Sequence, residues 1–248
     1  LPATTEYALP LSDRTLRNWT GEPCGPGGEV TLIEALAQSC NTAFAWLGNE
    51  LGADALRTQS QAFGFDTAFN IPLRASTSRF PDNPDAPQTA ISAIGQFDVR
   101  ATALQMAMVA AGIGNNGIVM EPYLVQELRG PDLSILRTTT ASEFGAAMSS
   151  QNAADLIEMM VAVVERGTAS VLRGVTTAEG QSVRVGAKTG TAQTSADRPS
   201  VAWMVALAPA TNPQIAVAVV VEDGGQNEIS SNAIAGPIAR AVIEAALR

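Results

Sequence analysis

Three segments in the last third of the chain constrain its fold more than any other feature. Residues 183–192 alternate between apolar and polar side chains, whereas residues 201–208 and 215–221 are almost continuously apolar. A short Pro-containing connection joins the last two segments, which places them side by side as antiparallel strands. Their apolar character predicts burial on both faces, so we expect helices on each side of the sheet.

Helical patterns begin much earlier in the chain. Thr31-Leu32-Ile33-Glu34 has the form of a capping box, which predicts a helix starting there. Ser39-Cys40-Asn41 interrupts that helix, because Ser and Asn compete for backbone hydrogen bonds, and a second helix is expected to run to Gly52. Residues 63–90 are predicted to be mainly loop because Gly and Pro recur in them.

Further helices are predicted at residues 102–111 and 152–165 and from about Ser231 onward. In the last of these, Ile234, Ile238 and Val242 recur every four residues, as expected of a helix that covers the sheet. Helices gathered early and strands gathered late are typical of an α+β fold with an antiparallel sheet flanked by helices. Because no linker divides the chain, we expect one domain spanning residues 1–248.

Composition excludes several classes of function. The formal charge of −9 and the scattering of the fifteen basic residues argue against nucleic acid as a partner. No apolar run approaches the roughly 20 residues of a membrane helix. The chain has no histidine, so it contains neither a Ser-His-Asp relay nor an imidazole metal site, and lysine or a carboxylate would have to move protons. We therefore expect no metal and no cofactor.

Lys188 is the one lysine of the chain and stands in the run Lys188-Thr189-Gly190-Thr191. This run offers an ammonium, two hydroxyls and a glycine that a ligand backbone can approach, which suits a carboxylate next to a peptide carbonyl. An exposed strand end with a solvated lysine is the alternative. For Ser39 and Asn41, the alternative is a plain N-cap of the second helix.

Cys24 and Cys40 are the two cysteines of the chain and lie sixteen positions apart. Two cysteines are too few for a zinc site. The spacing allows a disulfide, which would indicate a compartment outside the cytosol, but two buried free thiols are equally compatible with the composition.

These motifs carry a resemblance to a known family. Ser39-Cys40-Asn41 and Lys188-Thr189-Gly190 resemble the S-x-N and K-T-G motifs of penicillin-binding protein transpeptidases and serine β-lactamases. Ile94-Gly95-Gln96, Glu165-Arg166-Gly167-Thr168-Ala169 and Ala208-Pro209 extend the similarity to the class B penicillin-binding proteins. The two cysteines are most similar to the actinobacterial PBPA type, and this resemblance implies a Cys24–Cys40 disulfide beside the active site.

The chain also departs from the family pattern. The family's first motif, S-x-x-K, needs a lysine of its own, and the lysine of this chain is already part of K-T-G. The resemblance therefore implies that the nucleophilic serine, its lysine and two strands of the sheet lie upstream of Leu1, which would make the domain incomplete at its N-terminal side. Phe97 stands where relatives commonly have a second glycine, which would narrow the floor of the cleft.

The resemblance implies roles for the residues that match. Lys188 and the hydroxyls of Thr189 and Thr191 would hold the terminal carboxylate of a D-Ala-D-Ala stem peptide, with Gly190 allowing close approach. The backbone N–H of Thr191 would be one oxyanion donor. Ser39 would carry a proton to the leaving amine, and Asn41 would bind the peptide amide. β-Lactams would acylate the same upstream serine.

Three functions follow as hypotheses. The first is a peptidoglycan D,D-transpeptidase on the extracytoplasmic face of the membrane, in contact with the membrane only through an upstream anchor. The second is a D,D-carboxypeptidase or β-lactamase on the same fold. The third is a non-catalytic module that binds divisome or elongasome proteins of the cell-wall machinery.

Overall fold

The computed structural model describes residues 1–248 apart from 74, 194–198 and 224–229. At its centre, the described residues form an antiparallel sheet with the strand order β11-β10-β9. These strands are β9 (Gly186–Ala192), β10 (Val201–Ala208) and β11 (Ile215–Val221). The strands predicted at 201–208 and 215–221 are confirmed. The strand predicted at 183–192 is divided, because its first residue belongs to β8 (Ser182–Val183), which pairs with β7 (Val175–Thr176).

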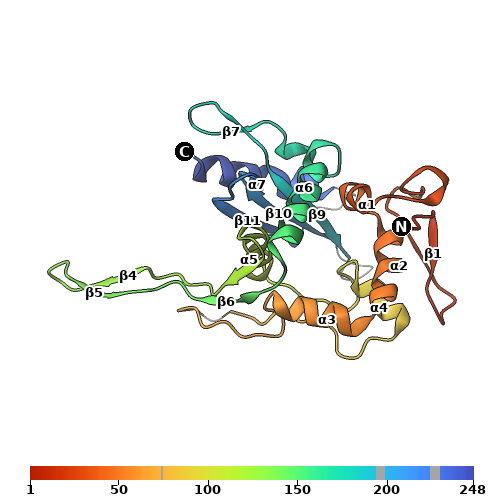
Figure 1. The fold of residues 1–248 in the computed structure, drawn as a ribbon, viewed down its shortest axis with the longest axis horizontal. Coiled ribbons are helices and arrows are strands. Elements are labelled where there is room, and N and C mark those ends of the chain that lie inside the picture. Colours follow the sequence, from red (N-terminus) through yellow and green to blue (C-terminus); the bar gives the residue numbers. More distant parts are fainter. Residues whose placement is uncertain (74, 194–198, 224–229) are drawn as a thin grey trace.

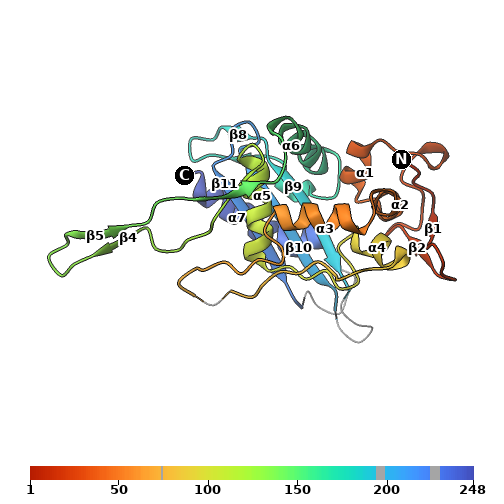
Figure 2. The same cartoon turned by 60° about the horizontal axis from the view of Figure 1, so that its bottom comes forward.

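Helices cover both faces of this sheet. Figures 1 and 2 show α7 (Ser231–Ala246) on one face, with α5 (Ala103–Gly114) and α6 (Ser150–Glu165) on the other. Alternate residues of β10 enter different clusters: Met204 packs in the cluster that contains α7, and Leu207 packs in the one formed by α5 and α6. This alternation is the two-residue period of a strand. The predicted α+β fold with a flanked antiparallel sheet is confirmed.

The buried stripe of α7 differs from the predicted one. Ile238 and Val242 are 46% and 42% exposed, whereas Ala239 and Ile243, one position further along, are fully buried. The small side chains let the helix lie close to its neighbours: a Cβ at Gly236 would come within 2.3 Å of a Val171 methyl carbon. Close packing against Val171, in the segment after α6, therefore selected the face that carries Ala235, Gly236 and Ala239.

Four α-helices precede α5 among the described residues: α1 (Leu32–Gln38), α2 (Asn41–Leu51), α3 (Ala53–Ala62) and α4 (Ala86–Ser92). α1 packs against α6, and α2 packs against α3 and α4. Thr31 caps α1 as predicted, by accepting from Glu34 N–H at 3.3 Å. The reciprocal side-chain bond is absent from the described contacts, because Glu34 instead pairs with Arg166.

α4 lies within the region predicted to be loop, so that prediction is wrong for its last part. Asp85 and Gln88 form a complete capping box there, and Pro87 occupies the first turn. Proline is compatible with a first helical turn, because the amide it lacks would have no intrahelical acceptor there. Pro87 therefore marks the start of a helix and does not break one.

The N-terminal residues form a small layer over α2. β1 (Glu6–Ala8) pairs with β2 (Thr15–Arg17), and the short helix η1 (Pro26–Gly28) follows. Asn18, which is buried, donates to Thr4 O at 3.1 Å and accepts from Thr42 N–H at 3.1 Å. One side chain thus joins this layer to the first turn of α2.

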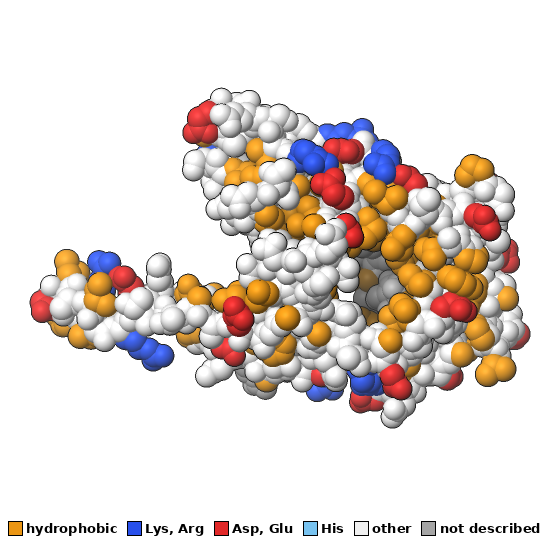
Figure 3. Space-filling model, in the orientation of Figure 1, with side chains coloured by type: hydrophobic (Ala, Val, Ile, Leu, Met, Phe, Trp, Pro, Cys, Tyr) orange, Lys and Arg blue, Asp and Glu red, His pale blue; other side chains and the backbone are white. Residues whose placement is uncertain are grey.

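The chain between the end of α5 and the start of α6 forms a long hairpin that projects from the body (Figure 1). Its base is the pair β3 (Ile118–Met120) and β6 (Glu143–Ala146), and its outer part is the pair β4 (Glu127–Arg129) and β5 (Ile135–Thr138). Apolar side chains lie along the projecting part in Figure 3, and those that are at least half exposed are Leu124, Leu133, Ile135 and Leu136. No helix among the described residues combines the length and apolar character needed to cross a bilayer.

Candidate active site

Ser39 and Lys188 meet where the end of α1 faces the outer edge of β9. Lys188 Nζ donates to Ser39 Oγ at 2.7 Å and to Thr189 O at 2.7 Å. The two residues are 149 positions apart in the sequence, so only the tertiary structure brings them together. A solvated lysine at a free strand end is therefore the wrong interpretation of K-T-G in this chain.

The backbone at Ser39 explains why its hydroxyl faces the strand. Ser39 ends α1 in the left-handed conformation, with φ 57° and ψ 51°, and its N–H donates to carbonyl groups of that helix. Residues other than glycine rarely adopt this conformation. Cys40, not Ser39 or Asn41, is the N-cap residue of α2. The alternative that Ser39 or Asn41 serves as a plain N-cap is therefore wrong.

Lys188 has an unusual proton affinity. Burial of the side chain lowers its pKa from 10.5 to about 8, because the charged form loses its hydration. The oxygen atoms of Ser39 and Thr189 accept two of its N–H groups. Lys188 is consequently protonated at neutral pH and still able to release a proton within a physiological range.

The two threonines of K-T-G-T are hydrogen-bonded to different elements. Thr189 Oγ1 lies 2.6 Å from Thr168 Oγ1, in the loop after α6. Thr191 Oγ1 lies 2.9 Å from Ser231 Oγ, at the start of α7. Gly190, between them, is close to Trp203 of the neighbouring strand, and a Cβ added at Gly190 would lie 3.3 Å from the Trp203 Cβ.

The backbone of β9 offers hydrogen-bonding groups on its outer edge. Within the described residues β9 is an edge strand, paired only with β10. Gln96, from the loop after α4, donates through Nε2 to Thr191 O at 3.4 Å. The loop that carries Gln96 is tightly turned, since its neighbours Gly95 and Phe97 have φ values of 77° and 62°. Phe97, in the same loop, is 53% exposed.

The structure does not bring Asn41 to Lys188. Its Nδ2 donates to Arg17 O at 3.1 Å, toward the β1–β2 hairpin. Asn41 is the first residue of α2, directly after the Ser39-Cys40 turn, so its side chain lies at the same helix start. Its role in binding substrate stays a prediction.

Cys24 and Cys40 form a disulfide, with an S–S distance of 2.10 Å and a Cα–Cα distance of 6.0 Å. The disulfide implied by the family resemblance is confirmed, and the alternative of two free thiols is wrong. Because Cys40 is the middle residue of S-x-N and is 1% exposed, the bond ties the N-terminal layer directly to the turn that presents Ser39. The separation of 16 residues corresponds to about 3 kcal/mol on the chain-entropy estimate.

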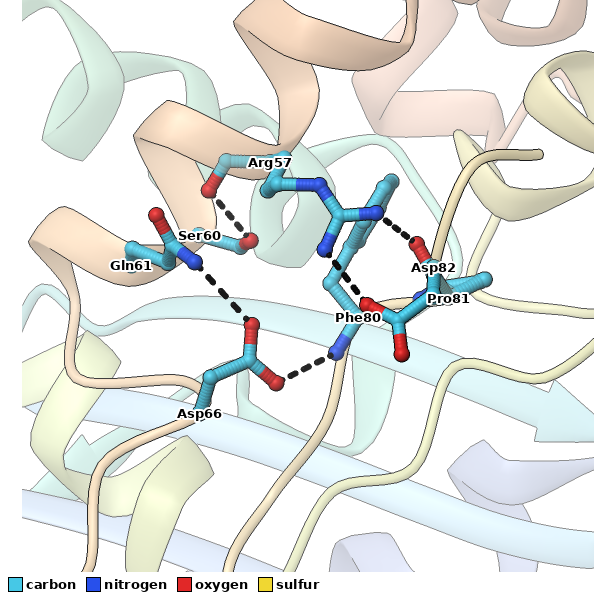
Figure 4. Close-up of polar contacts among 7 residues, drawn as sticks. All are labelled: Arg57, Ser60, Gln61, Asp66, Phe80, Pro81 and Asp82. Atoms are coloured by element: carbon cyan, nitrogen blue, oxygen red, sulfur yellow. Dashed lines mark hydrogen bonds and ion pairs between the residues drawn. The ribbon is translucent and has the colours of Figure 1, made fainter.

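A second polar cluster lies on α3 and the segment after it (Figure 4). Arg57 donates to Asp82 Oδ1 at 3.0 Å and to Pro81 O, and its guanidinium lies 5.9 Å from the Phe80 ring centroid. Asp66 accepts from the Phe80 N–H at 3.3 Å. A cavity of about 460 Å³ adjoins the cluster, and no residue of S-x-N or K-T-G lines it. The hydrogen bonds of the cluster hold Asp66 and Asp82 against α3, which is a structural role.

Sequence patterns missed Thr168, Ser231 and Gln96 as parts of this site. Gln96 and Thr168 stand in segments that resemble the family, but nothing in the sequence says which side chains they contact. The sequence indicates Ser231 only as the start of a helix. Ser231 is 2% exposed at the first turn of α7. Its link to the site becomes visible only from its hydrogen-bond partners in the structure.

The family profile for the penicillin binding protein transpeptidase domain matches residues 4–244. The chain belongs to this family. Its place in the family is close to two curated relatives, both described as peptidoglycan D,D-transpeptidase PbpA. The one from Mycolicibacterium smegmatis is 47% identical over 255 residues, and the one from Mycobacterium tuberculosis is 44% identical over 253 residues.

Each of these alignments covers 100% of this chain and 50% of the relative, so the chain spans about half the length of the curated relatives it matches. A solved structure of penicillin-binding protein A from M. tuberculosis, a ceftriaxone acyl-enzyme complex, matches with a TM-score of 0.94 at 43% identity. That match covers 100% of this chain and 55% of the other. The transpeptidase fold expected from the motifs is therefore confirmed over this chain.

Proposed function

We propose that this chain is the part of a peptidoglycan D,D-transpeptidase domain that binds the substrate's terminal carboxylate and returns a proton to the leaving amine. The observation that carries the proposal is the 2.7 Å contact between Lys188 Nζ and Ser39 Oγ. It joins two of the family motifs at one edge of the sheet. The descriptions of relatives at 44% and 47% identity support it.

The nucleophile of this reaction would come from outside residues 1–248, because the one lysine of the chain is already part of K-T-G. A serine of an S-x-x-K motif would form a bond to the carbonyl carbon of the penultimate D-Ala and give its proton to the adjacent lysine. The oxygen of the tetrahedral intermediate would accept from the backbone N–H of Thr191. The C–N bond would then break, leaving the peptide on the serine as an ester.

Ser39 and Lys188 would act on the leaving group. As the C–N bond breaks, the D-Ala nitrogen takes a proton through the Ser39 hydroxyl, and Lys188, whose pKa is lowered to about 8, holds that hydroxyl in place. The amine of a second stem peptide would next attack the ester carbonyl and release the serine. The product is a cross-link between two peptides.

Substrate binding would use the rest of the edge. Lys188, Thr189 and Thr191 supply an ammonium and two hydroxyls for the terminal carboxylate, and Gly190 adds no side chain to the strand between them. Asn41 would bind the peptide amide after its side chain leaves Arg17 O. No metal or cofactor takes part in these steps.

The same proposal includes partners and location. β-Lactams would be covalent inhibitors because they acylate the same serine, and divisome or elongasome proteins would recruit the domain. The Cys24–Cys40 disulfide supports a place on the extracytoplasmic side of the membrane, since disulfides persist in oxidising compartments. The membrane contact would be an anchor outside residues 1–248. The S-x-x-K helix and the first strands of the domain would also lie outside this range.

Labelling with a fluorescent penicillin, followed by intact-mass analysis, tests the proposal. We expect the natural protein that carries residues 1–248 to gain one stable adduct on a serine outside this range, and residues 1–248 alone to stay unlabelled. Lys188→Ala should slow acylation about 100-fold, as does loss of one preorganised donor in other acyl-transfer sites. Arg129→Ala, which removes a cation from the exposed hairpin, is the matched control and should react like the wild type.

Three outcomes would contradict this proposal. Labelling of Lys188→Ala at the wild-type rate would exclude Lys188 from the reaction. No labelling of the natural protein under any condition would favour a non-catalytic module that keeps the family's architecture. Steady turnover of penicillin, in place of a stable adduct, would favour a β-lactamase.

A further inference from the structure

The segment Arg166-Gly167-Thr168, directly after α6, is held against the end of α1 that presents Ser39. Arg166 Nε donates to Glu34 Oε1 at 2.8 Å. A Cβ at Gly167 would lie 2.1 Å from the carbonyl oxygen of Ala37, so no larger residue fits there without movement. Thr168 N–H donates to the same carbonyl oxygen at 3.1 Å. The position of Thr168 is therefore determined by backbone contacts as well as by its own side chain.

From this position Thr168 reaches the K-T-G strand. Its Oγ1 lies 2.6 Å from the Oγ1 of Thr189, and both residues are partly buried. Among the described residues, Thr189 is the hydrogen-bond partner of the Thr168 hydroxyl. One short segment thus contacts both the helix that carries S-x-N and the strand that carries K-T-G.

The number of protons available decides the direction of the hydrogen bonds on the neighbouring threonine. Ser231 Oγ lies 2.6 Å from Gly190 O and 2.9 Å from Thr191 Oγ1. A carbonyl oxygen can only accept, and a hydroxyl has one proton, so Ser231 donates to Gly190 O. It must then accept from Thr191. The Thr191 proton therefore points toward α7, and Thr191 can donate to a ligand only after losing this hydrogen bond.

Thr189 has no such restriction. The Thr168–Thr189 pair has two protons and one hydrogen bond between them, so one proton is free for a further acceptor. A ligand carboxylate accepts only. If Thr168 donates to Thr189, then Thr189 donates to the carboxylate, and the pair gains a hydrogen bond without losing one.

We propose that Thr168 is a positioning residue for carboxylate recognition, donating to Thr189 so that the Thr189 proton points toward the anionic end of the ligand. This proposal rests on the proposed function, because it assigns the ligand carboxylate to the K-T-G strand. Thr168 acts through Thr189 and does not contact the ligand. The two threonines of K-T-G-T accordingly differ: Thr189 is ready to donate in the resting protein, and Thr191 is not.

The test uses the natural protein and compares Thr168→Val, which removes the hydroxyl and keeps the shape, with Thr168→Ser, which keeps the hydroxyl. Second-order rate constants of acylation are measured with benzylpenicillin and with its methyl ester, which lacks the negative charge. We expect Thr168→Val to react about threefold to tenfold more slowly with benzylpenicillin, the size of one hydrogen bond, and to keep the wild-type rate with the ester. Thr168→Ser should restore the rate with benzylpenicillin.

The ester also reports on folding, since a partly unfolded variant loses rate with both compounds. Thr168→Ala replaces Thr168→Val if the valine variant does not fold. An equal loss with both compounds would show a structural role only and would overturn the proposal, as would no loss with either. If the wild-type protein is not acylated at all, the proposed function fails and this inference fails with it. If the wild-type protein is acylated but the Thr168 variants lose the same rate with benzylpenicillin and with its ester, this inference alone is refuted.

Discussion

Lys188 is the residue at which the surroundings change the chemistry most. Burial lowers its pKa from 10.5 to about 8, while two oxygen acceptors hold its ammonium in one orientation. In the unfolded chain the ammonium of this lysine keeps its hydration, so its charged form carries no burial penalty. Lys188, which would bind the substrate, therefore lowers the free energy of unfolding at neutral pH.

This difference predicts a pH dependence of stability. Between pH 8 and 10.5 the unfolded chain binds more protons at Lys188 than the folded protein does, so the free energy of unfolding rises with pH across that window. The contribution of this residue is on the order of 3 kcal/mol. Urea unfolding at several pH values should show the rise in the wild type and not in Lys188→Met. Parallel pH curves for the two proteins would contradict the lowered pKa of Lys188.

At the scale of elements, the S-x-N turn is held from three sides. α1 ends in a left-handed Ser39, the Cys24–Cys40 disulfide joins the turn to the N-terminal layer, and Asn18 hydrogen-bonds the first turn of α2. These contacts come from separate parts of the chain. They explain how a short turn between two helices can hold a hydroxyl in a defined position.

Removal of the disulfide tests this view. Replacing Cys24 and Cys40 by alanine should lower the free energy of unfolding by about 3 kcal/mol, because the unfolded chain is no longer constrained. Reduction of the wild-type protein under non-denaturing conditions should give the same loss, and it serves as the control for the packing of the substituted side chains. Unfolding curves that coincide for all three samples would show that the bond does not contribute to stability.

At the scale of the whole molecule, the β4–β5 hairpin stands apart from the body (Figures 1 and 3). Its strands pair with each other, and Leu133, Ile135 and Leu136 are 73%, 58% and 69% exposed. Little apolar surface is therefore buried by folding this part of the chain. No residue of β4 or β5 belongs to the core clusters of the described residues, so we expect the core and the site at the edge of β9 not to depend on the hairpin.

We expect the hairpin to be removable. Replacing residues 127–138 by Asn-Gly, a two-residue turn between Gln126 and Thr139, should change the free energy of unfolding by less than about 1 kcal/mol. Gln126 O and Thr139 N are already hydrogen-bonded at 2.8 Å, so the new turn has a suitable base. A loss of several kcal/mol in urea unfolding would show that the hairpin supports the body.

Local patterns in the sequence specify the class of fold, most of the regular elements, the family and the two motifs of the site. Strands 201–208 and 215–221 and the start of α1 at Thr31 follow from local patterns of burial and capping, which neighbouring residues specify. The loop predicted over residues 63–90 conceals α4, because the recurring Gly and Pro residues outweigh the capping box of Asp85 and Gln88.

The tertiary structure alone decided what each site residue contacts. Ser39 meets Lys188 across 149 positions, Thr168 meets Thr189 across 21, and Ser231 meets Thr191 across 40. A local pattern cannot predict such pairs, because a hydroxyl has no periodicity and its partner depends on how whole elements pack. For the same reason α7 buries its small residues and exposes Ile238. The close approach of α7 to Val171 selects that face, and only the folded chain defines this approach.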